Sequence, residues 1–95
     1  MRDYELMFII SPRVREEDTG NVTDRVKQFI ANAGGEVTKA EELGLRRLAY
    51  PIRDSREGFY VVLNFRMNPK ATTELERNLK LTEDIIRYLL VRLGD

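Results

Sequence analysis

The sequence predicts an α+β fold in which one antiparallel sheet of four strands carries two helices on one face. Strand-like and helix-like segments follow one another in the order β-α-β-β-α-β, which is the order of a split βαβ, or ferredoxin-like, arrangement. Right-handed crossovers place both helices on the same side, with strands one and three central and strands two and four at the edges. A length of 95 residues suits one modest core, so residues 1–95 are expected to form a single domain.

The first strand and the first helix differ in the period of their apolar residues. Tyr4–Ile10 alternates as a strand, and Ser11–Pro12 ends it. In Glu16–Ala33 the apolar residues are spaced by four, three and one positions, which predicts a helix. Acidic residues fill its first turn, as the helix dipole prefers, and Gly34–Gly35 ends it.

The middle of the chain predicts a long hairpin. Glu36–Ile52 reads as a strand interrupted at Gly44, where a bend or bulge is expected. Pro51 favours an edge position, because proline cannot donate a ladder hydrogen bond. The polar segment Arg53–Gly58 is expected to be the turn, and Phe59–Met67 is the clearest strand in the sequence.

The last two elements complete the pattern. A second helix is expected to open at Asn68–Pro69, because proline is tolerated at the first helical position. Leu75 and Leu79, four residues apart, define its inner side. Ile85–Leu93 reads as the last strand.

Alternation along the strands predicts a sheet that is apolar on both faces. The helix-covered face is expected to hold Leu6, Phe8, Val61, Leu63, Phe65, Tyr88 and Leu90. The open face is expected to hold Met7, Ile9, Tyr60, Val62, Leu89 and Val91, with Asn64, Arg66 and Arg87 beside them. An exposed apolar cluster of this size favours a partner, either protein or RNA. The alternative is ordinary surface apolarity, since over half of a typical protein surface is apolar.

The composition argues against an enzyme. The chain has no cysteine and no histidine, which removes thiolate ligands, the commonest metal ligand and the usual general base. An acylphosphatase-like site on this fold would need an anion-cradling loop after the first strand, but "SPRVREED" is acidic and lacks glycine. We therefore expect no catalytic residue, metal or cofactor. No segment approaches the roughly 20 apolar residues of a membrane-spanning helix, and a soluble, cytoplasmic protein is expected.

The arginines are the candidates for RNA contact. The chain has 16 basic and 16 acidic residues, so any basic surface must be local. Arg46 and Arg47 are adjacent on a strand and must face opposite sides; with Arg53 and Arg56 they form a cluster suited to phosphates. The alternative is a solvated hairpin, balanced by nearby Glu41, Glu42, Asp54 and Glu57. Arg2, Arg87 and Arg92 are expected to extend the basic surface.

A second RNA-binding hypothesis uses the third strand. "REGFYVVLNF" partly matches the signature of the RNA-recognition motif, whose aromatics stack on bases. Only Tyr60 falls on the open face, however. The match is partial, and it leaves a free-standing single-stranded RNA binder as the alternative function.

Three segments carry a family resemblance across essentially the whole chain. They are "EELGLRRLAYPI" (Glu41–Ile52), "GFYVVLNF" (Gly58–Phe65) and "DIIRYLLVRL" (Asp84–Leu93), together with "YE" at Tyr4–Glu5. The sequence resembles the bacterial small-subunit ribosomal protein S6 family. The resemblance implies a cytoplasmic, ribosomal protein without catalytic activity or cofactor. It also implies that the protein binds the central domain of small-subunit ribosomal RNA with ribosomal protein S18, its heterodimer partner during assembly.

The resemblance also suggests site residues. Arg46 and Arg47 match the family's arginine pair, and Arg2 and Arg87 match basic positions near the RNA. With Arg92, these are the predicted RNA-binding residues. The predicted partner-binding residues are the aromatic of the motif and the open face: Met7, Ile9, Tyr50, Tyr60, Val62, Leu89 and Val91.

Overall fold

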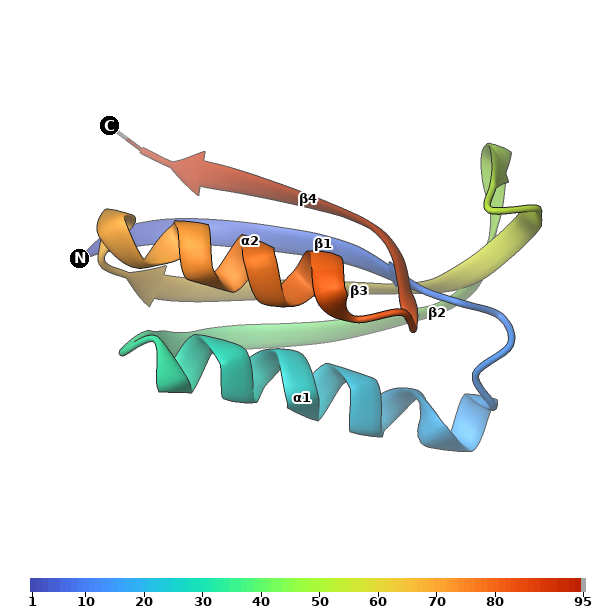
Figure 1. Cartoon of the computed structure of the whole chain (residues 1–95), viewed down its shortest axis with the longest axis horizontal. Helices are drawn as coiled ribbons and strands as arrows, with labels where there is room; N and C mark the ends of the chain where they lie inside the picture. The colour runs from blue at the N-terminus through green and yellow to red at the C-terminus, as the bar shows by residue number, and fades with distance from the viewer. Residues whose placement is uncertain (95) are drawn as a thin grey trace.

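The computed structural model describes residues 1–94 and has the predicted α+β architecture (Figure 1). The strands are β1 (Arg2–Ile10), β2 (Glu36–Ile52), β3 (Ser55–Met67) and β4 (Ile85–Leu93). The helices are α1 (Thr19–Asn32) and α2 (Thr72–Leu81), and each follows a short 3-10 turn, Glu16–Asp18 or Pro69–Ala71. The α-helix thus begins later than Glu16. At the second 3-10 turn the Asn68 side chain accepts a hydrogen bond from the Lys70 backbone N–H at 3.0 Å.

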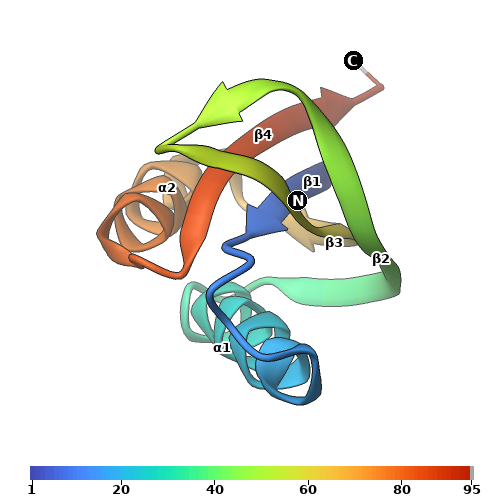
Figure 2. The ribbon, with the colours of Figure 1, turned by 90° about the vertical axis from the view of Figure 1, so that its right-hand side faces the viewer.

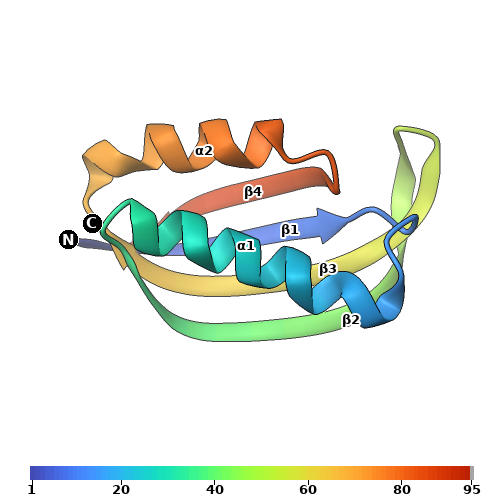
Figure 3. The same cartoon turned by 60° about the horizontal axis from the view of Figure 1, so that its bottom comes forward.

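The sheet has the order β2-β3-β1-β4 with antiparallel neighbours, which confirms the predicted topology. Both helices lie on the same face of it (Figure 3). Phe8 of β1 lies opposite Val61 of β3 and Tyr88 of β4, so these three side chains share a face. Pro51 lies on the edge strand β2, as predicted.

The main core fills the space between the sheet and the helices, which confirms the predicted helix-covered face. Strand residues Leu6, Phe8 and Leu63 and helix residues Val26 and Leu75 are fully enclosed there. Burying each such side chain stabilises the fold by about 1.5–3 kcal/mol. The apolar sides of both helices are therefore buried in this core.

The β2–β3 hairpin differs from its prediction at the turn. Gly44 (φ 81°) sits at a shift of register after Glu42, as expected for a bulge. However, β3 begins at Ser55, so the turn is only Arg53–Asp54, with φ of 49° and 65°. Two positive φ angles form the tight connection whose twist matches that of the flanking strands. Most of the segment predicted as turn therefore belongs to β3.

The end of this hairpin curls over the open face of the sheet (Figure 2). Leu48 packs with Ile9 and Ile86 in a second, smaller buried cluster, which Ile52 and Tyr60 flank. The prediction of a bare face is therefore wrong at this end of the sheet. The reason is the bulged, strongly twisted hairpin, which brings apolar residues of its own over the face.

Candidate RNA and protein interfaces

The part of the open face beyond the hairpin remains accessible, and we call it the apolar strip: Met7, Val62, Leu89 and Val91. Met7 lies opposite Val62 on one side and opposite Leu89 on the other, so the three are neighbours across β3, β1 and β4. Leu89 is 54% exposed and Val91 39% exposed, while Met7 and Val62 are half-buried. Ile9 is only 3% exposed and lies beneath Leu48. Its side chain is therefore nearly absent from the exposed surface in this conformation.

A groove of about 180 Å³ separates the hairpin end from the sheet. Besides Ile9 and residues of the apolar strip, Leu48, Tyr50, Tyr60 and Arg87 line it. Arg87 donates a side-chain hydrogen bond to the Tyr50 hydroxyl, and its guanidinium carbon lies 5.6 Å from the ring centroid. The structure thus joins a predicted partner-binding residue to a predicted RNA-binding residue. Local sequence patterns could not predict this contact, because the two residues are 37 positions apart.

The predicted RNA-binding arginines do not form one surface. Arg87 lies opposite Ile9, and Arg46 and Arg47 lie opposite Gly58 and Glu57, so these three are at the hairpin end of the sheet. Arg2 and Arg92 are exposed at the other end, where β1 begins and β4 ends (Figure 3). Strands advance about 3.4 Å per residue. Because β1 has nine residues, the two groups are separated by most of the length of the sheet.

A third group of arginines surrounds a surface hollow of about 470 Å³ at the hairpin end, which we call the arginine hollow. Arg47, Arg53 and Arg56 of the predicted cluster line it, and Arg46 does not. Arg13, from the loop after β1, completes it and was missed by the sequence analysis. Arg13 is distant in sequence from the hairpin, so only the tertiary fold reveals the grouping.

Arg66, which was expected beside the open face, forms an ion pair with Asp3 at 3.3 Å. Partial burial, then the hydrogen bond to Glu76 and the charge of that group, raise the pKa of Tyr88 above its usual 10.0. Among residues 1–94 no three histidine, cysteine or carboxylate side chains are grouped to hold a metal. Over the same residues, no helix has the length and apolar character needed to cross a membrane.

Together, the fold and these surfaces define a ferredoxin-like domain with an exposed apolar strip and separate groups of exposed arginines. The family model for ribosomal protein S6 matches residues 3–92. Small ribosomal subunit protein bS6 of Caldanaerobacter subterraneus subsp. tengcongensis is 43% identical over 95 residues, covering all of both chains. The Moorella thermoacetica protein of the same name is 44% identical and is covered over 97% of its length, with all of this chain aligned.

A solved structure agrees with these sequence matches. The crystal structure of 30S ribosomal protein S6 from Thermotoga maritima superposes with a TM-score of 0.91 and 41% identity, over 96% of this chain and 86% of that one. The chain therefore belongs to the ribosomal protein S6 family, which consists of non-enzymatic structural proteins of the small ribosomal subunit.

Proposed function

We propose that this protein binds the central domain of small-subunit ribosomal RNA as a heterodimer with ribosomal protein S18 during assembly of the subunit. The observation that carries the proposal is the apolar strip. Leu89 and Val91 are exposed to solvent beside Met7 and Val62, and both helices lie on the opposite face of the sheet, where they cannot cover these side chains. Membership of the S6 family directs the proposal to the ribosome.

The division of labour follows from the chemistry of the two kinds of surface. An apolar strip gains free energy by leaving water, which favours a protein partner. Exposed arginines offer paired N–H donors and charge, which favours backbone phosphates. The chain as a whole is neutral, so its RNA affinity depends on where the arginines lie and on the help of the partner.

The structure offers less support for the alternative of a free-standing RNA-recognition-type binder. That function needs Tyr60 free to stack on a base. Here Tyr60 is half-buried and packs beside the cluster of Ile9, Leu48 and Ile86 under the hairpin. Stacking on it would require the hairpin end to lift away.

The test is a binding titration against a central-domain RNA fragment, with and without S18, at two salt concentrations. We expect tight binding only with S18, and a salt dependence that reports phosphate contacts. Binding of short single strands by the protein alone, and a large loss on Tyr60→Ala, would favour the alternative instead.

A substitution separates the partner surface from the RNA surface. Val62→Asp puts a charge in the middle of the apolar strip and should abolish pairing with S18 while the thermal unfolding transition persists. Thr73→Asp adds the same charge at an exposed position on α2 and should leave pairing intact. If the Val62→Asp variant still pairs with S18, the apolar strip is not part of the interface.

A further inference from the structure

The arginine hollow gathers positive charge that the chain as a whole does not have. Arg13, Arg47, Arg53 and Arg56 line it, against only two acidic residues, Asp54 and Glu57. Four positive charges against two leave an excess of two, whereas the complete chain has 16 of each sign. Such a local excess is what an anionic ligand requires of a neutral protein.

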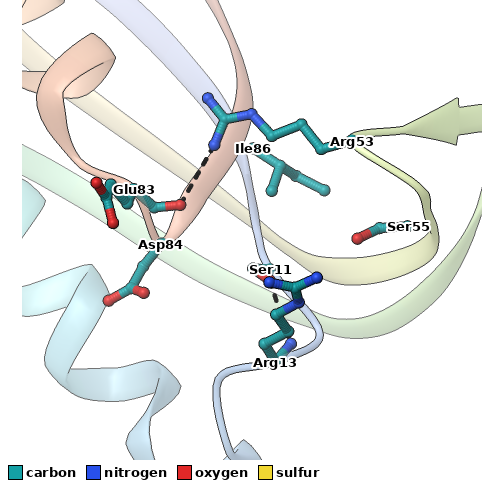
Figure 4. A pocket seen from close by; sticks show the side chains of 7 residues that line it. All are labelled: Ser11, Arg13, Arg53, Ser55, Glu83, Asp84 and Ile86. Atoms are coloured by element: carbon teal, nitrogen blue, oxygen red, sulfur yellow. Dashed lines mark hydrogen bonds between the residues drawn. The ribbon is translucent and has the colours of Figure 1, made fainter.

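Hydrogen bonds hold the segments around this hollow in place; Figure 4 shows the adjoining hollow, which shares Arg13 and Arg53 with it. The Ser11 backbone N–H donates to the carbonyl of Asp84 at 2.7 Å, and the Arg13 backbone N–H donates to Ser11 Oγ at 3.2 Å. From the hairpin turn, Arg53 Nη1 donates to the carbonyl of Glu83 at 3.4 Å. The β1–α1 loop and the hairpin end are thus both tied to the start of β4. Arg13 and Arg53 are therefore presented together.

The arginines of the hollow keep donors available. Within residues 1–94, no carboxylate lies in ion-pair range of Arg13, Arg47 or Arg56. Arg53 uses one of its five N–H groups on Glu83. The adjoining hollow in Figure 4 shares Arg13 and Arg53 with the arginine hollow, but its other charged lining residues are Glu83 and Asp84, so it has no excess of positive charge.

The arginine hollow and the groove have no lining residue in common. Arg47 lines the hollow, while its neighbour Leu48 packs on Ile9 beneath the hairpin. Consecutive residues of a strand point to opposite faces. A ligand in the hollow and a protein docked on the apolar strip would therefore contact different residues.

We propose that the arginine hollow binds backbone phosphates of the ribosomal RNA, with Arg13 and Arg56 as contacts outside the family-matched arginine pair. This proposal rests on the proposed function, and it locates the protein's contact with RNA in the arginine hollow. Planar guanidinium groups bind phosphate oxygens through paired N–H donors, which lysine does not provide. The RNA then lies along the hairpin and the β1–α1 loop, and S18 lies on the apolar strip.

The test compares two double variants in the complex with S18 and the central-domain RNA fragment. Arg13→Gln with Arg56→Gln removes two charges from the hollow. Arg77→Gln with Lys80→Gln removes two exposed charges from α2 and serves as the control. Each lost phosphate contact lowers the slope of log K against log salt by about 0.7–0.9. We expect the hollow variant to lose about 1.4–1.8 units of slope and to bind about 25- to 60-fold more weakly at 0.1 M salt.

Each outcome has a distinct meaning. A slope equal to that of the control variant overturns the phosphate site while the proposed function stands. If the hollow variant fails to pair with S18 in the absence of RNA, the phosphate site is overturned, and the hollow binds an acidic segment of the partner instead. Failure of the wild-type pair to bind the RNA overturns the proposed function, and the phosphate site with it.

Discussion

Gly58→Ala tests the packing of the hairpin over the sheet. Gly58 is buried on β3, where a methyl group in place of its hydrogen would lie 2.4 Å from Cγ2 of Ile9 and 3.0 Å from the carbonyl oxygen of Ile10. Ordinary contact begins near 3.4 Å, so the Ile9 methyl would have to retreat by about 1 Å. It has little freedom to do so, because the side chain is β-branched and Leu48 and Ile86 enclose it.

The expected cost lies in the upper part of the range for overpacking, about 2–3 kcal/mol of unfolding free energy. The nearby carbonyl belongs to the paired strand β1, and moving it would disturb the ladder. The assay is urea unfolding followed by circular dichroism. With an m-value of about 1.5 kcal/mol per molar urea, the midpoint should fall by about 1–2 M.

Gly20→Ala is the matched control. Gly20 is exposed in α1, with no atom within 4 Å of the added methyl group. Alanine there should raise stability by up to about 1 kcal/mol, because glycine is the poorer helix former. An unchanged or raised midpoint for Gly58→Ala would refute the packing of the hairpin against Ile9.

Three further results are expected. Leu48→Ala should cost about 2 kcal/mol in the same urea assay, the low end for a buried leucine, because its cluster is small; no loss would mean that the hairpin end does not pack on the sheet. Arg46→Ala and Arg47→Ala should each lower the salt slope of RNA binding by about 0.7–0.9 if each contacts one phosphate, and an unchanged slope would assign them to protein contacts or to none. In an ultraviolet titration Tyr88 should ionise above pH 10.0, and Glu76→Gln should lower its pKa. Because the raised pKa applies only to the folded state, Tyr88 should reduce stability as the pH rises above 10.0; a normal titration of Tyr88 would contradict its contact with Glu76.

The spacing of apolar residues predicted the strands, the helices and the two faces of the sheet. It could do so because side chains on one face recur every 2.0 residues in a strand and every 3.6 residues in a helix. The helix-covered face is confirmed for this reason, and the bulge is confirmed where Gly44 interrupts the strand pattern. The turn was not predicted correctly, because Arg53–Asp54 lacks the Asn-Gly or Asp-Gly pair that usually marks a two-residue hairpin. Alternation also says nothing of how far a hairpin twists, and so the burial of Ile9 was missed.

The candidate site was less predictable than the fold, because its groupings are tertiary. The alternation of side chains along a strand correctly placed Arg46 and Arg47 on opposite sides of β2. It did not separate Arg2 and Arg92 from the hairpin end, since that separation follows from the antiparallel order of long strands. Arg13 joins the hollow only because the loop after β1 is tied to the start of β4.

One hairpin end serves both proposed surfaces, and this has a thermodynamic consequence. The contacts that fasten it to the sheet include Tyr50 with Arg87, Arg53 with Glu83, and Leu48 with Ile9. A partner on the groove side and RNA on the hollow side would each restrict the motion of the same segment. The second ligand would then meet a hairpin whose ordering entropy has already been lost. By linkage, S18 must strengthen RNA binding by the same factor by which RNA strengthens S18 binding. Coupling of this kind suits an assembly step in which two proteins and one RNA must come together.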